Sequence, residues 1–479
     1  MLIKTLDSRG CKFNEELNPA CSFNSSFYRL QRIEDSFDKV TKHIFSDSSP
    51  FISEPIRKLR VEQSYAGDKI GRLQIKPSSR ERWQVPFKHP KSIEYLSPKP
   101  LEFLNTESHS TIAVFNEETI FDTHYSPLVY EDQFMQLSTR LPSKFSYFGL
   151  GETDKENFQL DRTQRKRTTI WPVGLEVKRD KNGYGHHPFI MGVSEDGKTA
   201  FALCLINSNL MEIELIGDML IYRTTGGVFD IYILTGNSPG DVLSLYHQLI
   251  GTTFMPPYWA YGYQLSKWGY RDLDDLKNTV ERNRQAGIPL ETQYIDIDYM
   301  ERALGFTIGQ NFTGLDEFAK ELELNDMKLV LIFDPTICTQ PYTNYPNQDY
   351  KPLSEAYAAD IFVKRENGKE LLGIAYAGLE DSGRGPPTPG WTPKTCPSAY
   401  PDFFMSKTAN WWQNQLSDFH KSVPFHAIWI DKNEPANYRG QYGDGAIDGC
   451  EVNNLNNPPF VPALSSGFKF FDYSVEFLF

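Results

Sequence analysis

Acidic side chains in this sequence lie at the ends of three predicted strands. The acids are Asp296 with Asp298, Asp334, and Asp431 with Glu434. Clustered carboxyl groups can transfer protons, attack an electrophilic carbon or hold a hard cation such as Mg²⁺ or Ca²⁺. The sequence has no glycine-rich phosphate-binding loop to accompany a metal site. Acid–base or nucleophilic chemistry is therefore favoured, and a metal site is the alternative.

Strands and helices alternate in the part of the chain that carries these acids. The pattern predicts strands at 261–266, 292–298, 328–334 and 427–430, and helices at 272–287, 316–325 and 406–422. Asp272 is a good helix N-cap and Gly287 a good stop. Serial strand–helix units imply a parallel sheet, whose strand ends share one face. The acids are therefore expected to lie close together.

The rest of the chain divides by its pattern. Residues 31–253 show short strands with frequent turns, typical of a β-sandwich, and one helix at 239–250. Residues 254–464 hold about the first four units of a (β/α)8 barrel, with an insertion at 335–405 that contains a hairpin, 361–365 with 370–376. Residues 1–30 resemble part of a trefoil module, and 465–479 form an unrelated aromatic tail. Because a closed barrel needs eight units, we expect the chain to be interrupted at both ends.

The composition limits the partners. There are 49 basic and 62 acidic residues, a net charge of −13, and no basic stripe, which disfavours nucleic acid and anionic membranes. The sequence contains no apolar run long enough to span a membrane and no signal-peptide pattern near Met1. The six cysteines form no metal-binding pattern, and Cys204 is predicted to be a buried thiol. Two glycosylation sequons begin at Asn24 and Asn311 and agree with a secretory origin.

The residues around the acids suggest a sugar-binding cleft. Aromatic residues are abundant, and Trp268, Trp391 and Trp429 lie near the acidic strand ends in sequence. Aromatic rings can stack on a sugar while carboxylates bind its hydroxyl groups, and one carboxylate can attack the anomeric carbon. The sequence therefore predicts an enzyme that acts on oligosaccharides and needs no cofactor.

The stretch Trp429–Pro435, WIDKNEP, resembles the WIDMNEP signature of the family 31 glycoside hydrolases, the α-glucosidases. Within that family the chain is similar to the maltase-glucoamylase, sucrase-isomaltase and lysosomal α-glucosidase group. The resemblance covers roughly residues 8–464. Its further motifs are Tyr147–Glu152, Tyr184–Phe189, Met255–Tyr270, Asp296–Met300 and Gly449–Pro459.

The resemblance implies roles for individual residues. Asp431 matches the catalytic nucleophile and Asp296 the acid that holds sugar hydroxyls. The other expected sugar contacts are Ile297 beside Asp296, Trp429 beside the nucleophile, Trp268 as an aromatic wall, Asp161 on a loop of the β-domain, and Trp391 as a platform for the leaving sugar. Asp334, judged from the residues alone, is expected either to contact the sugar or to cap the loop before Pro335. Asp298 is expected to organise the strand end, and Glu434 to support the site through hydrogen bonds.

Two departures from the family pattern stand out. Lys432 replaces the family's Met. Strand alternation would aim its side chain away from the sugar, whereas a cation beside Asp431 would stabilise the carboxylate's negative charge. The family's general acid/base, and an Arg and a His of the same subsite, are expected beyond residue 479. The prediction is a retaining, maltase-like α-glucosidase of the secretory pathway; the alternative is an inactive, truncated or sugar-binding remnant of such an enzyme.

Overall fold

The computed structural model describes residues 28–36, 39–47, 53–88, 100–104, 106–124, 128–170, 185–340, 350–365, 367–375, 396–433, 458–460 and 462. The chain forms two compact units that meet in sequence between Thr253 and Phe254. Residues 1–27, which hold the expected trefoil pattern, and the tail 465–479 lie outside the described residues, as do Trp391 and Glu434.

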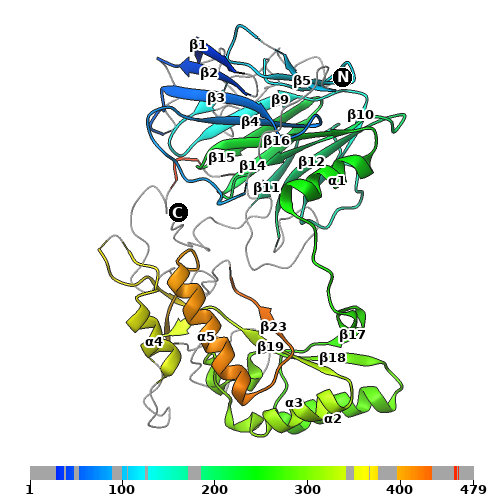
Figure 1. The fold of residues 1–479 in the computed structure, drawn as a ribbon, viewed down its shortest axis with the longest axis vertical. Helices are drawn as coiled ribbons and strands as arrows, with labels where there is room; N and C mark the ends of the chain where they lie inside the picture. Colours follow the sequence, from blue (N-terminus) through cyan, green and yellow to red (C-terminus); the bar gives the residue numbers. More distant parts are fainter. Residues whose placement is uncertain are drawn as a thin grey trace. The chain divides into compact units, whose positions relative to one another are not determined.

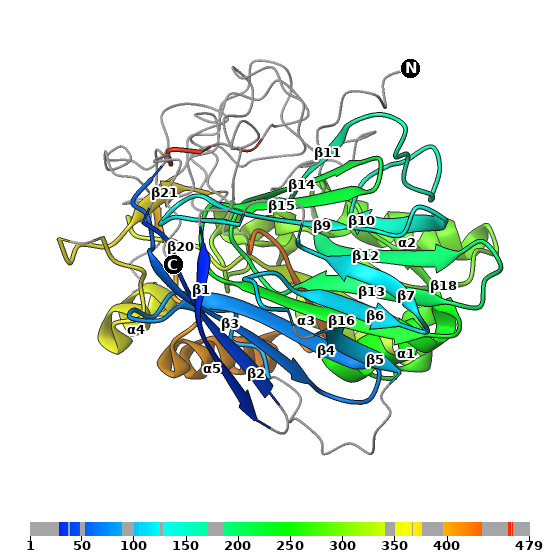
Figure 2. The same ribbon diagram turned by 90° about the horizontal axis from the view of Figure 1, so that it is seen from above.

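The first unit contains two large antiparallel sheets (Figures 1 and 2). One sheet has, in spatial order, β1 (Arg29–Ser36), β2 (Lys39–Phe45), β3 (Lys58–Tyr65), β4 (Ile70–Pro77), β16 (Phe229–Gly236), β13 (Ala200–Leu205), β12 (His187–Ser194) and β10 (Phe145–Gly151). The other has β11 (Lys166–Ile170), β14 (Met211–Ile216), β15 (Met219–Thr224), β9 (Met135–Arg140), β7 (Glu118–Asp122), β6 (Ile112–Phe115) and β5 (Leu101–Leu104), with β8 (Val129–Tyr130) paired to β9.

One hydrophobic core joins the two sheets. Alternate residues point into it, such as Met211, Ile213 and Leu215 of β14, and they meet side chains of the other sheet, such as Val61 and Leu73. The β-rich character predicted for this region is thus confirmed. The helix α1 (Pro239–Ile250) has the predicted bounds, because the Ser238 hydroxyl accepts from the Asp241 N–H at its start and Gly251 ends it at a φ of 95°.

The second unit contains the predicted parallel sheet (Figure 1). Its strands, in spatial order, are β17 (Tyr263–Leu265), β18 (Leu290–Ile295), β19 (Lys328–Phe333) and β23 (Ala427–Ile430). The helices α2 (Leu273–Gln285), α3 (Leu315–Leu324) and α5 (Ser406–Ser422) bury apolar side chains in a common core with β18 and β19. Short 3-10 turns are η3 (Tyr258–Tyr261), η4 (Ile297–Tyr299), η5 (Glu301–Ala303) and η6 (Gln310–Phe312). Asp272 caps α2 by accepting from the Asp275 N–H at 2.8 Å, as its position predicted.

The insertion differs from the sequence expectation. The turn at Asn367-Gly368 is present, and Lys364 forms an antiparallel bridge with Glu370. The second arm, however, continues as β21 (Leu372–Ile374), which pairs with β22 (Pro397–Ala399) and not with 361–365; β22 also pairs with β20 (Ile337–Cys338). The helix α4 (Lys351–Ala359) was not predicted.

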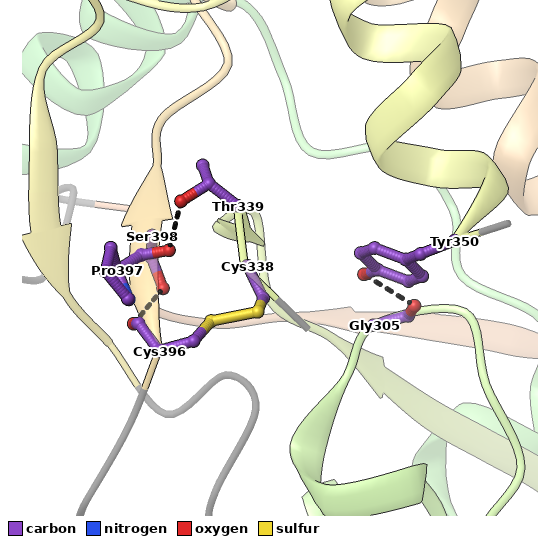
Figure 3. Close-up of a disulfide and its surroundings, with 7 residues drawn as sticks. All are labelled: Gly305, Cys338, Thr339, Tyr350, Cys396, Pro397 and Ser398. Atoms are coloured by element: carbon purple, nitrogen blue, oxygen red, sulfur yellow. Dashed lines mark hydrogen bonds between the residues drawn. A yellow bond between two sulfur atoms is a disulfide. The ribbon is translucent and has the colours of Figure 1, made fainter. Parts of the chain in front are cut away.

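A disulfide closes this insertion. Cys338 and Cys396 are bonded across a sequence separation of 58, and both are buried (Figure 3). The Thr339 hydroxyl donates to the Pro397 carbonyl at 2.8 Å beside the bond. This pair was not predicted from the sequence, although the two cysteines lie near the two ends of the insertion. Cys204 is the free, buried thiol that was predicted.

Candidate active site

The strand register brings the acids to one end of the sheet. Ile295 of β18 pairs with Leu331 of β19, and Phe333 of β19 pairs with Ile430 of β23. The acids come next along each strand: Asp296 directly follows Ile295, Asp334 follows Phe333, and Asp431 follows Ile430. Because the strands are parallel, these carboxyl ends share one edge of the sheet. This is the juxtaposition that the sequence predicted.

Asp296 begins the turn η4, and its carboxyl group interacts electrostatically with Asp431 and Lys432, which follow β23. Its Oδ1 accepts from the Ile297 N–H at 2.7 Å, and the Ile297 side chain is buried. Burial raises the pKa of Asp296, the negative charge of Asp431 raises it further, and the Lys432 ammonium and the Ile297 N–H lower it. Asp296, Asp431 and Lys432 therefore form one interacting group of charges.

Asp298 anchors the loop that carries Trp268. Its Oδ2 accepts from the Gly269 N–H at 2.9 Å, and Gly269 has a φ of 104°, which favours glycine. Burial raises the pKa of Asp298 to about 7, and the charge of Asp296 contributes. The Trp268 ring packs against the core of the second unit. Asp298 thus organises the strand end, as expected for it.

Lys432 contacts Asp431 directly. Its Nζ lies 3.2 Å from Asp431 Oδ2, and the two side chains are 27% and 31% exposed. The alternation expected for Lys432 does not apply, because β23 ends at Ile430 and Lys432 has a φ of 61°. That left-handed conformation departs from the extended backbone on which alternation depends. Strand alternation therefore does not indicate where the Lys432 side chain points, and the ammonium lies beside Asp431, which is one of the two possibilities that the sequence left open.

Asp334 lies deeper than the other acids and is 7% exposed. The neighbouring Tyr299 hydroxyl donates to the Ile332 carbonyl at 2.8 Å, and burial together with the charge of Asp334 raises the pKa of Tyr299. These contacts fix the end of β19 against η4. A hydroxyl contact by Asp334 to a sugar stays a prediction.

Aromatic and amide groups line the sheet just before the acids. The Trp429 ring meets the Tyr294 ring edge-on, with centroids 6.2 Å apart. The Tyr294 hydroxyl donates to Gln264 Oε1 at 2.6 Å. Tyr294 and Gln264 were not singled out from the sequence, although their place in β18 and β17, the strands that precede Asp296 and Trp268, was a usable signal.

Asp161 belongs to the first unit, in the turn before β11. Its Oδ1 accepts from the N–H of Thr163 at 2.8 Å and from the Thr163 hydroxyl at 2.6 Å. These hydrogen bonds, led by the hydroxyl, lower the pKa of the exposed Asp161 carboxyl. Its contact with a sugar stays a prediction, as do those of Trp391 and Glu434.

The described residues give two further results. Among them, no group of three or more His, Cys, Asp or Glu side chains is arranged to hold a metal ion. Within the same residues, no helix is both long enough and apolar enough to cross a membrane.

Comparison with known proteins identifies the family. Residues 253–458 match the model of the glycosyl hydrolases family 31 TIM-barrel domain. The chain is 34% identical to intestinal sucrase-isomaltase of Homo sapiens over an alignment of 474 residues that covers 95% of this chain and 24% of that protein. It is 32% identical to lysosomal alpha-glucosidase of Rattus norvegicus over 457 residues, 94% of this chain and 45% of that protein. The predicted resemblance to family 31 is confirmed, and the chain belongs to this family.

The family resemblance extends to the fold. The structure of the glucosidase II alpha subunit superposes with a TM-score of 0.67 at 17% identity, over 87% of this chain and 52% of that one. A family 31 dextranase of Flavobacterium johnsoniae gives a TM-score of 0.67 at 17% identity, over 86% and 48%. The chain thus spans about half of these structures and half or less of the two curated relatives.

Proposed function

We propose that this chain carries the nucleophile and sugar-binding acids of an α-glucosidase that releases terminal α-linked glucose from oligosaccharides with retention of configuration. The observation that carries the proposal is the electrostatic group of Asp296, Asp431 and Lys432 at the strand ends of a family 31 domain. The names of the relatives, intestinal sucrase-isomaltase and lysosomal alpha-glucosidase, support an α-glucoside as the substrate.

The proposed chemistry has two displacements. An Asp431 carboxylate oxygen attacks the anomeric carbon, and the bond to the leaving oxygen breaks with its electron pair. A second carboxyl, ~5–5.5 Å from the nucleophile in retaining enzymes, protonates that oxygen and later activates the water that cleaves the glycosyl ester. The resemblance assigns this acid to a position well beyond Asp431 in sequence. Asp296 accepts hydrogen bonds from the sugar hydroxyls, and Trp429 and Trp268 bound the ring.

The proposed compartment is the secretory pathway. The buried Cys338–Cys396 disulfide supports this, because such bonds persist mainly in oxidising compartments. The lysosomal and intestinal relatives agree with it.

The decisive test is covalent trapping of the nucleophile. A 5-fluoro-α-glucosyl fluoride has a leaving group that needs little protonation, so its reaction reports on the nucleophile itself. We expect one sugar per chain, attached to the peptide that contains Asp431, as read by peptide mass spectrometry. Asp431→Asn should remove the label, because an amide cannot form the glycosyl ester.

Two controls sharpen the test. The β-configured fluoride should not label, since its anomeric carbon presents the opposite face. Labelling on Asp334 or Glu434 would overturn the assignment of Asp431. Reversible binding of glucose without any label from the α-fluoride would favour the sugar-binding alternative.

A further inference from the structure

The sequon at Asn311-Phe312-Thr313 lies in a turn, and two of the sequon's three residues are exposed to solvent. Asn311 and Thr313 are exposed, whereas the Phe312 side chain between them is 1% exposed and belongs to the core of the second unit. The Phe312 N–H donates to the Gly309 carbonyl at 2.9 Å, and the Thr313 hydroxyl donates to the Gln310 carbonyl at 2.8 Å. The buried ring therefore fixes the turn η6 while its neighbours face solvent.

The Asn311 amide has room for a large substituent. Its Nδ2 makes a long contact, 3.5 Å, with the Arg271 carbonyl. Attachment of a sugar to Nδ2 replaces one of two N–H hydrogens, so the other can keep this contact. An N-linked glycan at this position is therefore compatible with the folded turn.

A second observation points to the compartment in which this modification occurs. The same unit contains the buried Cys338–Cys396 disulfide. Disulfides and N-linked glycans are both features of chains that pass through the secretory pathway. The sequon by itself is a short pattern, whereas an exposed sequon in a disulfide-bonded unit is a specific prediction.

We propose that Asn311 is an acceptor of an N-linked glycan. The donor is an oligosaccharide linked to a lipid diphosphate. Asn311 Nδ2 forms the bond to the anomeric carbon of the oligosaccharide, the bond from that carbon to the diphosphate oxygen breaks, and the lipid diphosphate leaves with the electron pair. One amide proton passes to a base of the transferase. Thr313 supplies the hydroxyl that the acceptor pattern requires.

The test is site-specific detection of the glycan. The full chain is directed into the secretory pathway of mammalian cells and treated with peptide N-glycosidase in heavy-oxygen water, which converts a glycosylated Asn to a labelled Asp. We expect the label at position 311. Thr313→Ala should abolish it, and Thr313→Ser, which keeps a hydroxyl, should preserve it. Asn24→Gln removes the other sequon and should leave one glycan, which disappears when Asn311→Gln is added.

The experiment does not depend on export or on enzymatic activity. Transfer of the glycan precedes export, so the secreted and the cell-retained pools are both analysed and a folding defect cannot hide the result. An unmodified Asn311 peptide in both pools would overturn the proposal. So would a label at position 311 that persists in Thr313→Ala.

Discussion

The contact between Lys432 and Asp431 predicts that Lys432→Met will change how the site treats charged sugars. Two unit charges 3.2 Å apart attract by about 5 kcal/mol at an effective dielectric constant of about 20, and by about 1 kcal/mol in bulk water. Both side chains are close to one-third exposed, so the effective value lies between these limits. The ammonium therefore offsets much of the negative charge that a cationic ligand would meet.

The assay compares two ligands of the same shape. A piperidine iminosugar of gluco configuration carries a positive charge, whereas glucose is neutral. If the ligand's charge lies about 6 Å from Nζ, its repulsion by Lys432 costs about 1–3 kcal/mol, which is about 5- to 150-fold in affinity, and the lower part of this range applies to a partly exposed side chain. Lys432→Met should therefore strengthen iminosugar binding about tenfold, as measured by titration calorimetry on the chain. Glucose affinity should change by less than about twofold, because a neutral ligand meets no net repulsion.

Matched variants separate repulsion by the Lys432 ammonium from a general change in the net charge of the protein. Lys432→Arg keeps the charge and should keep the ratio of the two affinities. Lys421→Met removes an equal charge from the exposed end of α5 and should also leave the ratio unchanged. An unchanged ratio in Lys432→Met would refute the reasoning. Equal changes for both ligands would indicate a distorted site, and absence of binding by both would contradict the proposed function.

Three further predictions concern stability. Because the pKa of Asp298 is raised to about 7, the stability that this group contributes is present below its ordinary pKa near 4 and is lost as the pH rises towards 7. Asp298→Asn should therefore have the same free energy of unfolding in urea as the wild type at pH 4, and a larger one at pH 8. The difference at pH 8 should be a few kcal/mol, since each unit by which the pKa is raised corresponds to about 1.4 kcal/mol. Replacing both Cys338 and Cys396 by Ala should cost about 4 kcal/mol from the 58-residue separation, measured against Cys204→Ala, which removes a buried sulfur without opening a loop. Burial lowers the pKa of Lys42 to about 8, so wild-type stability should rise with pH from about 8 towards 10, and Lys42→Met should lack this rise.

Local signals in the sequence were sufficient for the regular part of the second unit. Helix α2 was predicted because Asp272 has a side chain that caps and Gly287 adopts a φ of 71° that stops a helix. The apolar run of β19 was recognisable because five of its six residues are buried. For the helix, the deciding interactions lie within a few residues of the sequence pattern that predicted it.

The features that were not predicted from the sequence depend on contacts between distant residues. The strand β22 has three residues and exists because it pairs with β20 and β21, which are far from it in sequence. The Cys338–Cys396 bond likewise joins two cysteines that no spacing rule connects. The direction of Lys432 was left open for a different reason, since alternation does not apply two residues beyond the end of a strand.

The acids at the strand ends look alike in the sequence but differ in the groups that stabilise their charges. A sheet that brings several carboxyl groups to one edge must offset their mutual repulsion. Asp298 accepts a hydrogen bond from the Gly269 N–H, and its pKa, raised to about 7, keeps the carboxyl group neutral at lower pH. Asp296 accepts a hydrogen bond from the Ile297 N–H. Asp431 instead forms an ion pair with the Lys432 ammonium, so its negative charge is stabilised by a side chain. Of these three acids, Asp431 is thus the one that forms an ion pair with a side chain, whereas the other two accept from backbone N–H groups. In the proposed function this is the acid that we expect to attack the anomeric carbon.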